Sequence, residues 1–322
     1  MNLFVDSGAP SIYNIWARKK KTKGVMGSFM KNRIQGETDD YSFLQSDDYL
    51  EYKKDYIKFL VENKDSLDVY VNFDIINNAE ATWANQLEME SYGLKPIPVF
   101  HIGEDFKWLK MILSKGYPYI ALGGIIPNPV PIIQPILDNV WSDYLVDSKG
   151  YPKVKVHGFA VTSARLVTRY PWWSTDSTSA SKIGIYGAIL VPKKSRGEWN
   201  YNVTANGIFV SNKSSKQNEI DGRHINTLTS FEKETVLFYL KEIGVPLGRS
   251  SFKTESPDYQ LKANERWVDT KQKTEVEIIE ESGVCNQYTL RNKVNLLFYI
   301  GLQKAIPEWP WPFKKVNEGF DL

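Results

Sequence analysis

The sequence predicts an α/β protein of the (β/α)8 TIM barrel type, with a β-rich insertion and a C-terminal helical elaboration. Short apolar runs alternate with amphipathic helical patterns as far as about residue 176, which is typical of βα units and a parallel sheet. Each of the expected strands in this part also ends in a polar residue or a glycine pair. Because such barrels carry their catalytic groups at the carboxyl ends of several strands, this arrangement predicts one site built from many strand ends.

The expected strands follow one another along the chain. They are Leu3 to Asp6, Val69 to Asp74, Ile97 to His101, Tyr119 to Gly124, Val154 to Gly158 and Trp172 to Asp176. Between them, Asp47 to Lys64 and Glu104 to Lys115 carry apolar residues at helical spacing and charges on the opposite face. Both segments lead into strands, so we expect them to be crossover helices.

The alternation of strand-like and helix-like segments ends at about residue 176. Ile183 to Val191 and Gly207 to Val210 resemble strands joined by a polar stretch, and we interpret them as the end of the barrel plus a β-rich elaboration. One domain is therefore expected over residues 1–322, with a barrel core to about 210, an elaboration over about 183–284, and a C-terminal helix and tail over 286–322.

Two further helices are expected in the C-terminal part. Thr229 to Ile243 begins with a capping box and is followed by glycine. A last helix is expected near Asn286 to Ala305, whereas the charged segment 245–284 gives no clear pattern. The tail from Ile306 to Phe313 is too rich in proline for a helix and too aromatic to stay solvated, so we expect it to pack on the body.

Composition narrows the class of protein. The 322 residues are 42% hydrophobic and 13% aromatic, which is enough for a sizeable core. The single cysteine, Cys285, excludes a disulfide framework and suits a reducing compartment. No secretory leader and no apolar run of the ~18 residues that span a membrane are apparent, so we expect a cytoplasmic protein. The net charge of +2 hides basic clusters at Arg18 to Lys23, Lys193 to Arg196 and Lys314-Lys315, which are either solvated faces or phosphate contacts.

Two of the strand ends, Asp6-Ser7-Gly8 and Asp176, supply carboxylates. Two carboxylates at one edge are the minimum set for replacing a group at a sugar anomeric carbon, because one can attack while the other moves protons. Each motif also has a structural interpretation. Asp6-Ser7-Gly8 could be a turn, Asp176 a helix N-cap, and Asp74 the cap of a helix through Ala79 to Glu90. Their shared place at strand ends favours a site.

The remaining strand ends offer substrate-binding groups. His101 follows an apolar strand, the Gly123-Gly124 pair could bring backbone amides close to a flat ligand, and His157-Gly158 combines both features. A core histidine and a plain tight turn remain the structural alternatives. No phosphate-binding loop, dinucleotide fingerprint or zinc-protease motif occurs in the sequence, so no cofactor is expected.

These motifs in this order resemble the tRNA-guanine transglycosylase superfamily, and within it the phage DpdA-type branch, whose members exchange guanine in DNA for a 7-deazaguanine. The segments that carry the resemblance are Val5 to Gly8, Phe73-Asp74, Leu122 to Ile125, His157 to Phe159 and Ser174 to Thr178. The resemblance covers roughly residues 1–180 and a piece near 285–300. It implies a DNA-guanine transglycosylase that inserts a preQ0-like base, located in the host cytoplasm if a phage encodes it.

The resemblance also implies roles for individual residues. Asp176 matches the nucleophile that attacks the nucleotide C1′ and forms a covalent glycosyl intermediate, and Asp6 matches the general base. Asp74 matches the aspartate that recognises the amino and ring N–H edge of the base. Further substrate-binding roles are implied for Ser7, Gly8, His101, Gly123, Gly124, His157 and Gly158. His101 stands where the family has glutamine, and His157 where it has methionine.

One departure from the family concerns metal. The tRNA enzymes hold a structural zinc with three cysteines and a histidine, but here only Cys285 remains, and Gln287 and Leu290 stand at the other thiolate positions. One cysteine cannot make a four-ligand zinc site, so we expect no metal.

The sequence therefore predicts a base-exchanging glycosyltransferase with DNA as its polymer partner, a 7-deazaguanine as its small-molecule substrate and no membrane partner. The oligomeric state, including a homodimer, stays open. The alternatives are the same chemistry on tRNA, a barrel hydrolase of N-glycosides that needs no basic surface, and a non-catalytic nucleic-acid-binding barrel. A guanine inside a duplex hides its glycosidic bond, so the DNA enzyme must flip its target or act on single strands.

Overall fold

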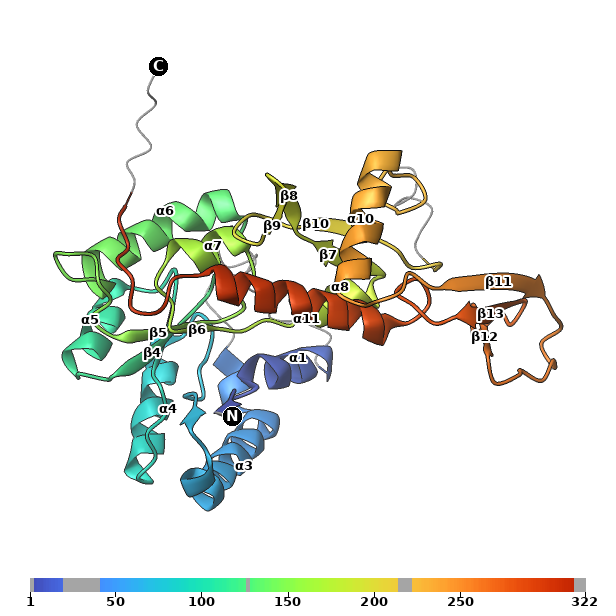
Figure 1. Ribbon diagram of the computed structural model, residues 1–322. Coiled ribbons are helices and arrows are strands. Elements are labelled where there is room, and N and C mark those ends of the chain that lie inside the picture. Colours follow the sequence, from blue (N-terminus) through green and yellow to red (C-terminus); the bar gives the residue numbers. More distant parts are fainter. Residues whose placement is uncertain (1–2, 20–40, 126–127, 214–221, 316–322) are drawn as a thin grey trace. The chain divides into compact units, whose positions relative to one another are not determined.

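The computed structural model describes residues 3–19, 41–125, 128–213 and 222–315 (Figure 1). The chain divides into two compact units. The first contains Met1–Val161, Arg169–Asp176 and Trp309–Leu322, and the second contains Thr162–Thr168 and Ser177–Glu308. Both units combine helices with strands, which gives the chain its α/β character.

The first unit is built on parallel strands that pair in chain order. They are β1 (Phe4–Val5), β2 (Val69–Tyr70), β3 (Val99–His101), β4 (Tyr119–Gly123), β5 (Lys155–Gly158) and β6 (Ser174–Thr175). β1 pairs with β2, and β3 to β6 form one sheet. A parallel bridge between Val71 and Ile97 connects the two groups. The parallel sheet expected from the sequence is confirmed, and its carboxyl ends lie along one edge.

Helices follow these strands along the chain, from blue to green in Figure 1. They are α1 (Ala9–Lys19), α3 (Asp47–Asn63), α4 (Ala79–Ser91), α5 (Phe106–Ser114), α6 (Val130–Val140) and α7 (Ala164–Arg169), with short 3-10 helices at Tyr41–Gln45 and Lys64–Ser66 and a π-helical turn at Trp141–Leu145. The expected crossover helices are confirmed as α3 and α5. Ser46 caps α3 by accepting a hydrogen bond from the Tyr49 amide, and Asp105 caps α5 in the same way.

The sheet is strongly curved. Phe4 of β1 stacks on His157 of β5 with 4.5 Å between the ring centroids. These strands are four places apart in the pairing order, which would separate them by about 19 Å in a flat sheet. Inside the curve, the buried residues Val71, Val99 and Ala121 pack with Phe4. The closed eight-stranded barrel itself stays a prediction.

The second unit joins antiparallel strand pairs to helices. β7 (Ala188–Val191) pairs with β10 (Asn206–Phe209), and β8 (Lys193–Ser195) pairs with β9 (Glu198–Asn200). The strand expected over Ile183 to Val191 begins only at Ala188, because the preceding residues complete α8 (Ser179–Ile185).

The two helices expected in the C-terminal part are confirmed. α10 (Ser230–Glu242) has the capping box predicted from its sequence. α11 (Tyr288–Ala305) is joined to β7 by the fully buried Asn295, whose Oδ1 accepts a hydrogen bond from the Leu190 amide at 2.7 Å. Its Nδ2 donates to the Ala180 carbonyl, which ties α11 to α8 as well.

Segment 245–284, which gave no clear pattern, contains a three-stranded antiparallel sheet. Its strands β11 (Arg249–Thr254), β12 (Glu265–Trp267) and β13 (Glu275–Glu281) pair in the order β11-β13-β12. The alternation of polar and apolar residues that reveals a half-buried strand is broken here, because Glu277 is fully buried next to the buried Val276.

The aromatic tail packs within the first unit, as expected. The Trp309 indole N–H donates to the Pro171 carbonyl at 3.1 Å. Phe313 is buried, contacts Tyr170 at 5.2 Å between centroids, and donates its amide to the Gly150 carbonyl. A side chain at Gly150 would clash with the Phe313 carbonyl, so this glycine permits the close approach of the tail.

Candidate active site

The predicted site residues all lie in the first unit, at the carboxyl ends of its strands. Asp6 follows β1, Asp74 follows the β2 segment, and His101 ends β3. The glycine pair ends β4, His157 and Gly158 end β5, and Asp176 follows β6. Because the strands are parallel, these groups gather at the same edge of the curved sheet.

Asp6-Ser7-Gly8 forms the link from β1 to α1 at this edge. Gly8 has a positive φ of 67°, and a Cβ there would lie 2.5 Å from the Tyr52 hydroxyl. The Gly8 carbonyl accepts from the Ser11 amide and so begins α1. In this link Ser7 is buried and Asp6 is exposed to solvent.

Asp74 lies at the centre of a buried polar cluster. Its Oδ1 accepts a hydrogen bond from the Ser7 hydroxyl at 3.1 Å, and its Oδ2 lies 3.0 Å from His101 Nε2. His101 Nδ1 is 3.4 Å from Glu104 Oε1. The His101 ring is therefore placed between two carboxylates. Asp74 does not cap α4, because Asn78 performs that role.

The charge of this cluster follows from its contacts. Burial alone would lower the pKa of His101, but hydrogen bonds and charges from Asp74 and Glu104 outweigh burial and raise the pKa to about 10. His101 is thus an imidazolium at neutral pH, and both of its N–H groups face carboxylates. It holds Asp74 in place rather than offering a free donor to a ligand.

The glycine pair packs against the end of β3. A Cβ at Gly123 would lie 2.5 Å from His101 Cδ2. Gly124 has a φ of 72°, and a Cβ there would lie 2.9 Å from the Ile102 carbonyl oxygen. Close packing on the His101 ring therefore requires glycine at 123, and close packing on the Ile102 backbone requires glycine at 124.

Asp176 is held from one side by protein donors. Its side chain is 50% exposed, and its Oδ1 accepts a hydrogen bond from the Ala160 amide at 2.7 Å. His157 Nε2 lies 3.5 Å from the same oxygen. Burial raises the pKa of Asp176, but His157 and the Ala160 amide outweigh this and bring the pKa below its usual range. The following helix has Thr178 as its N-cap residue, so Asp176 is not the cap.

The loop that presents the Ala160 amide is strained. Ala160 has a positive φ of 58°, which costs a residue with a Cβ roughly 1 kcal/mol. Just before it, Gly158 leaves no room for a side chain, since a Cβ would lie 2.8 Å from Val161 and 3.0 Å from Trp172. The backbone after β5 thus combines a tightly packed glycine with an alanine in the left-handed region, and the N–H of that alanine donates to Asp176.

The pKa of Asp6 is shifted in the opposite direction to that of Asp176. Although Asp6 reaches solvent, the surrounding protein desolvates its carboxyl group, and the charges of Asp74 and Asp176 add to the effect. Together they outweigh the Ser7 amide and raise the pKa of Asp6. Two carboxyl groups whose environments separate their pKa values are the usual arrangement for an acid or base beside an ionised nucleophile.

Sequence reasoning missed several groups of this site. The sequence predicts Glu104 to be the start of a helix, although its spacing of three residues from His101 is compatible with contact between the two side chains. Ser174 Oγ hydrogen bonds to both His157 Nδ1 and the Tyr119 hydroxyl, and nothing in the sequence links these three residues. The Ala160 contribution is a backbone group, which no residue pattern reveals.

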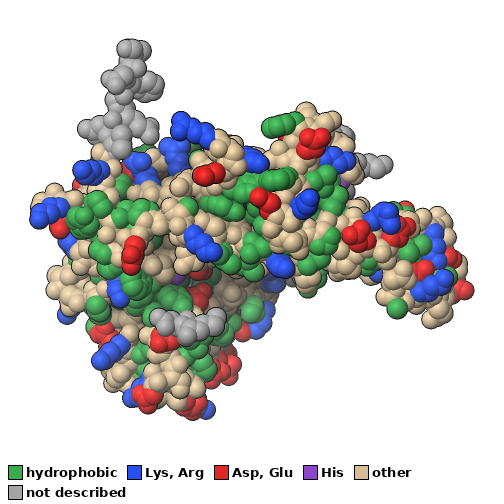
Figure 2. Space-filling view, viewed as in Figure 1, with side chains coloured by type: hydrophobic (Ala, Val, Ile, Leu, Met, Phe, Trp, Pro, Cys, Tyr) green, Lys and Arg blue, Asp and Glu red, His purple; other side chains and the backbone are tan. Residues whose placement is uncertain are grey.

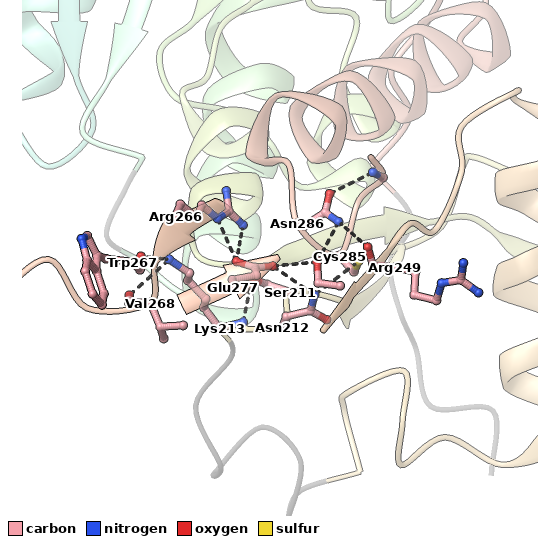
Figure 3. A network of polar contacts seen from close by, with 12 residues as sticks. Ser211, Asn212, Lys213, Arg249, Arg266, Trp267, Val268, Glu277, Cys285 and Asn286 are labelled. Carbon is pink, nitrogen blue, oxygen red and sulfur yellow. Dashed lines mark hydrogen bonds and ion pairs between the residues drawn. The ribbon is translucent and has the colours of Figure 1, made fainter. Parts of the chain in front are cut away.

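Cys285 lies in the second unit, in a network of polar contacts formed by one salt bridge and by side-chain amides (Figure 3). Both Arg266 Nε and Nη2 donate to the buried Glu277, and Asn212 Nδ2 donates to Glu277 and, at 3.5 Å, to Cys285 Sγ. Burial raises the pKa of the Cys285 thiol, which disfavours the thiolate that metals bind. Among the described residues, no group of three or more His, Cys, Asp or Glu could hold a metal ion.

The basic clusters predicted from the sequence differ in whether their side chains have acidic partners. Lys193 to Arg196 is exposed, whereas Lys19 forms an ion pair with Asp48. Lys20 to Lys23 lie outside the described residues. On the face in Figure 2, Lys and Arg side chains are interspersed with Asp and Glu.

Within the described ranges, no helix combines the length and apolarity needed to cross a bilayer. A comparison with models of known protein families gives no match, and a comparison with curated proteins gives none either.

Proposed function

We propose that this protein exchanges guanine in DNA for a 7-deazaguanine base through a covalent aspartyl-glycosyl intermediate. The observation that carries the proposal is the pair Asp176 and Asp6 at one sheet edge, with pKa values shifted in opposite directions. An ionised, accessible carboxylate beside a more easily protonated one suits substitution at an anomeric carbon.

The exchange takes two displacements. In the first, Asp176 attacks C1′ of the nucleotide, the bond to guanine N9 breaks, and Asp6 gives the departing base its proton. In the second, Asp6 takes the N9 proton of the incoming base, which attacks C1′ and releases the Asp176 carboxylate. Bonds and protons balance over the cycle, and no oxidant or metal is required.

The Asp74 cluster is suited to base recognition. An ionised carboxylate accepts hydrogen bonds only, and a guanine-like base presents adjacent N–H donors on its amino and ring nitrogen edge. Because Ser7 and His101 hold the two oxygens of Asp74 in place, Asp74 can present acceptors to this edge and select it against an acceptor edge. In this proposal, the Gly123 and Gly124 backbone meets the carbonyl side of the base.

The proposed scaffold is a (β/α)8 barrel. Support comes from parallel strands in chain order, a sheet curved enough to bring Phe4 onto His157, and a site at the carboxyl edge. The exposed segment Lys193 to Arg196, which contains β8, is proposed as a phosphate contact.

The experiment is incubation with radiolabelled guanine and either DNA or tRNA, followed by counting the precipitated polymer. We expect label in DNA, because exchange with guanine itself regenerates the same polymer. Label in tRNA alone would move the chemistry to the other polymer. Release of free base without incorporation would indicate an N-glycoside hydrolase. Absence of both incorporation and base release would indicate a binding protein. Asp55→Asn, an exposed change on α3, is the matched control.

A further inference from the structure

His157 carries a nitrogen that its surroundings leave unused. Its side chain is 3% exposed, and Nε2 has no hydrogen-bond partner of good geometry among the described residues. The atom nonetheless lies 3.5 Å from Asp176 Oδ1. A buried polar atom left without a partner is costly, so its direction toward the exposed carboxylate calls for an explanation.

Stacking on a substrate base does not provide this explanation. Phe4 is already stacked on the His157 ring, with centroids 4.5 Å apart and an interplanar angle of 27°. Phe159 contacts the ring edge-on at 4.7 Å. The imidazole is thus packed into the interior of the curved sheet, and its nitrogens remain as the groups that can act.

The other nitrogen is engaged in a hydrogen-bond chain. His157 Nδ1 lies 2.6 Å from Ser174 Oγ, which lies 2.5 Å from the Tyr119 hydroxyl. Burial raises the pKa of Tyr119, so its hydroxyl stays protonated and can donate. If Tyr119 donates to Ser174 and Ser174 donates to Nδ1, the proton of a neutral imidazole is on Nε2, facing Asp176.

We propose that His157 is a positioning residue that keeps Asp176 ionised and oriented, with its tautomer fixed by Ser174 and Tyr119. The Ala160 amide is the second donor to the same carboxylate oxygen. This inference rests on the proposed function, in which Asp176 is the nucleophile. The two donors leave the other oxygen, Oδ2, for attack and stabilise the carboxylate again when it departs in the second displacement.

The groups around Asp176 come from two strand ends. His157 and the Ala160 amide after β5 favour its ionised form, whereas burial opposes it. Asp6 after β1 is the neighbouring carboxyl group, and the charge of Asp176 raises the pKa of Asp6. Tyr119 of β4 acts only through Ser174. Removing the His157 donor should therefore let burial prevail, which raises the pKa of Asp176.

The test is a carboxyl-carbon NMR titration of substrate-free protein, with the Asp176 signal assigned from Asp176→Asn. His157→Gln retains an amide N–H near the Nε2 position, whereas His157→Asn places its amide near Nδ1 and leaves Asp176 without this donor. We expect the Asp176 midpoint to rise toward the ordinary aspartate value in His157→Asn and to stay near wild type in His157→Gln. Equal midpoints in all three proteins, or equal rises in both variants, would overturn the proposal.

A second variant covers the case in which His157→Asn does not fold. Ser174→Ala keeps the His157 ring and removes the hydroxyl that fixes its tautomer, so we expect a smaller rise of the Asp176 midpoint. An unchanged midpoint would contradict the hydrogen-bond chain from Tyr119 through Ser174 to His157. The titration needs no substrate. Absence of base exchange in a protein with these midpoints would therefore contradict the proposed function and leave the placement of His157 intact.

Discussion

Asp176→Asn is expected to abolish base exchange, with a loss on the order of 10⁴-fold or more, while DNA binding survives. The amide keeps the size of the side chain, and the Ala160 amide can still donate to its oxygen. It lacks the anionic oxygen that attacks C1′. The measurement is the rate of labelled guanine incorporation into DNA, together with affinity in a gel-shift assay.

The control for this variant is Asp55→Asn, which makes the same charge change at an exposed position of α3. It should incorporate guanine at the wild-type rate. Unimpaired exchange by Asp176→Asn would remove the nucleophile from this residue and with it the proposed mechanism. Loss of DNA binding in parallel with exchange would instead indicate a role in the interface.

His101→Leu is expected to destabilise the protein by about 3–5 kcal/mol, because it leaves Asp74 and Glu104 buried without the cation between them. The free energy of unfolding from urea titration at pH 7 measures this. The effect should also depend on pH. The pKa of His101 rises from 6.5 to about 10 on folding, so its contribution is complete below pH 6.5 and is lost as the pH rises through 10.

The difference in stability between wild type and His101→Leu should therefore shrink between pH 7 and pH 10. His224→Leu is the matched control, since His224 is equally buried but its ring contacts the Ser211 carbonyl and the Asn226 amide. Both partners are uncharged backbone groups, so this variant reports the cost of removing a buried ring that has no ion pair. A constant difference for His101→Leu between pH 7 and pH 10 would show that this ring is not held as an imidazolium.

Local signals in the sequence predicted much of the first unit. Parallel strands with polar carboxyl ends were recognisable because each apolar run stops at a carboxylate, a histidine or a glycine. α3 and α5 were recognisable because their apolar residues recur at helical spacing. These features depend on residues that are close in the sequence, so they can be predicted without knowledge of the tertiary structure.

The rest depended on contacts between distant residues. The buried Glu277 next to the buried Val276 breaks the alternation that marks β13, and Glu277 is satisfied by Arg266 of another strand, so the sequence does not predict the β11-β13-β12 sheet. The chain from Tyr119 through Ser174 to His157 joins three strands, and only the parallel register brings them together. The sequence predicts both aspartates at strand ends, but their opposite pKa shifts depend on burial and on residues distant in the chain, such as His157 for Asp176 and Asp74 for Asp6.

The covalent intermediate offers the most direct test of the proposed mechanism. Asp6→Asn should slow proton transfer in both displacements by ~10² to 10⁴-fold, so a protein–DNA adduct should form more slowly and then persist when the released guanine is removed and no replacement base is supplied. Protease and nuclease digestion followed by mass spectrometry should find a deoxyribose-linked remnant on the peptide that contains Asp176. A remnant on any other carboxylate, or no adduct in either wild type or Asp6→Asn, would contradict the account.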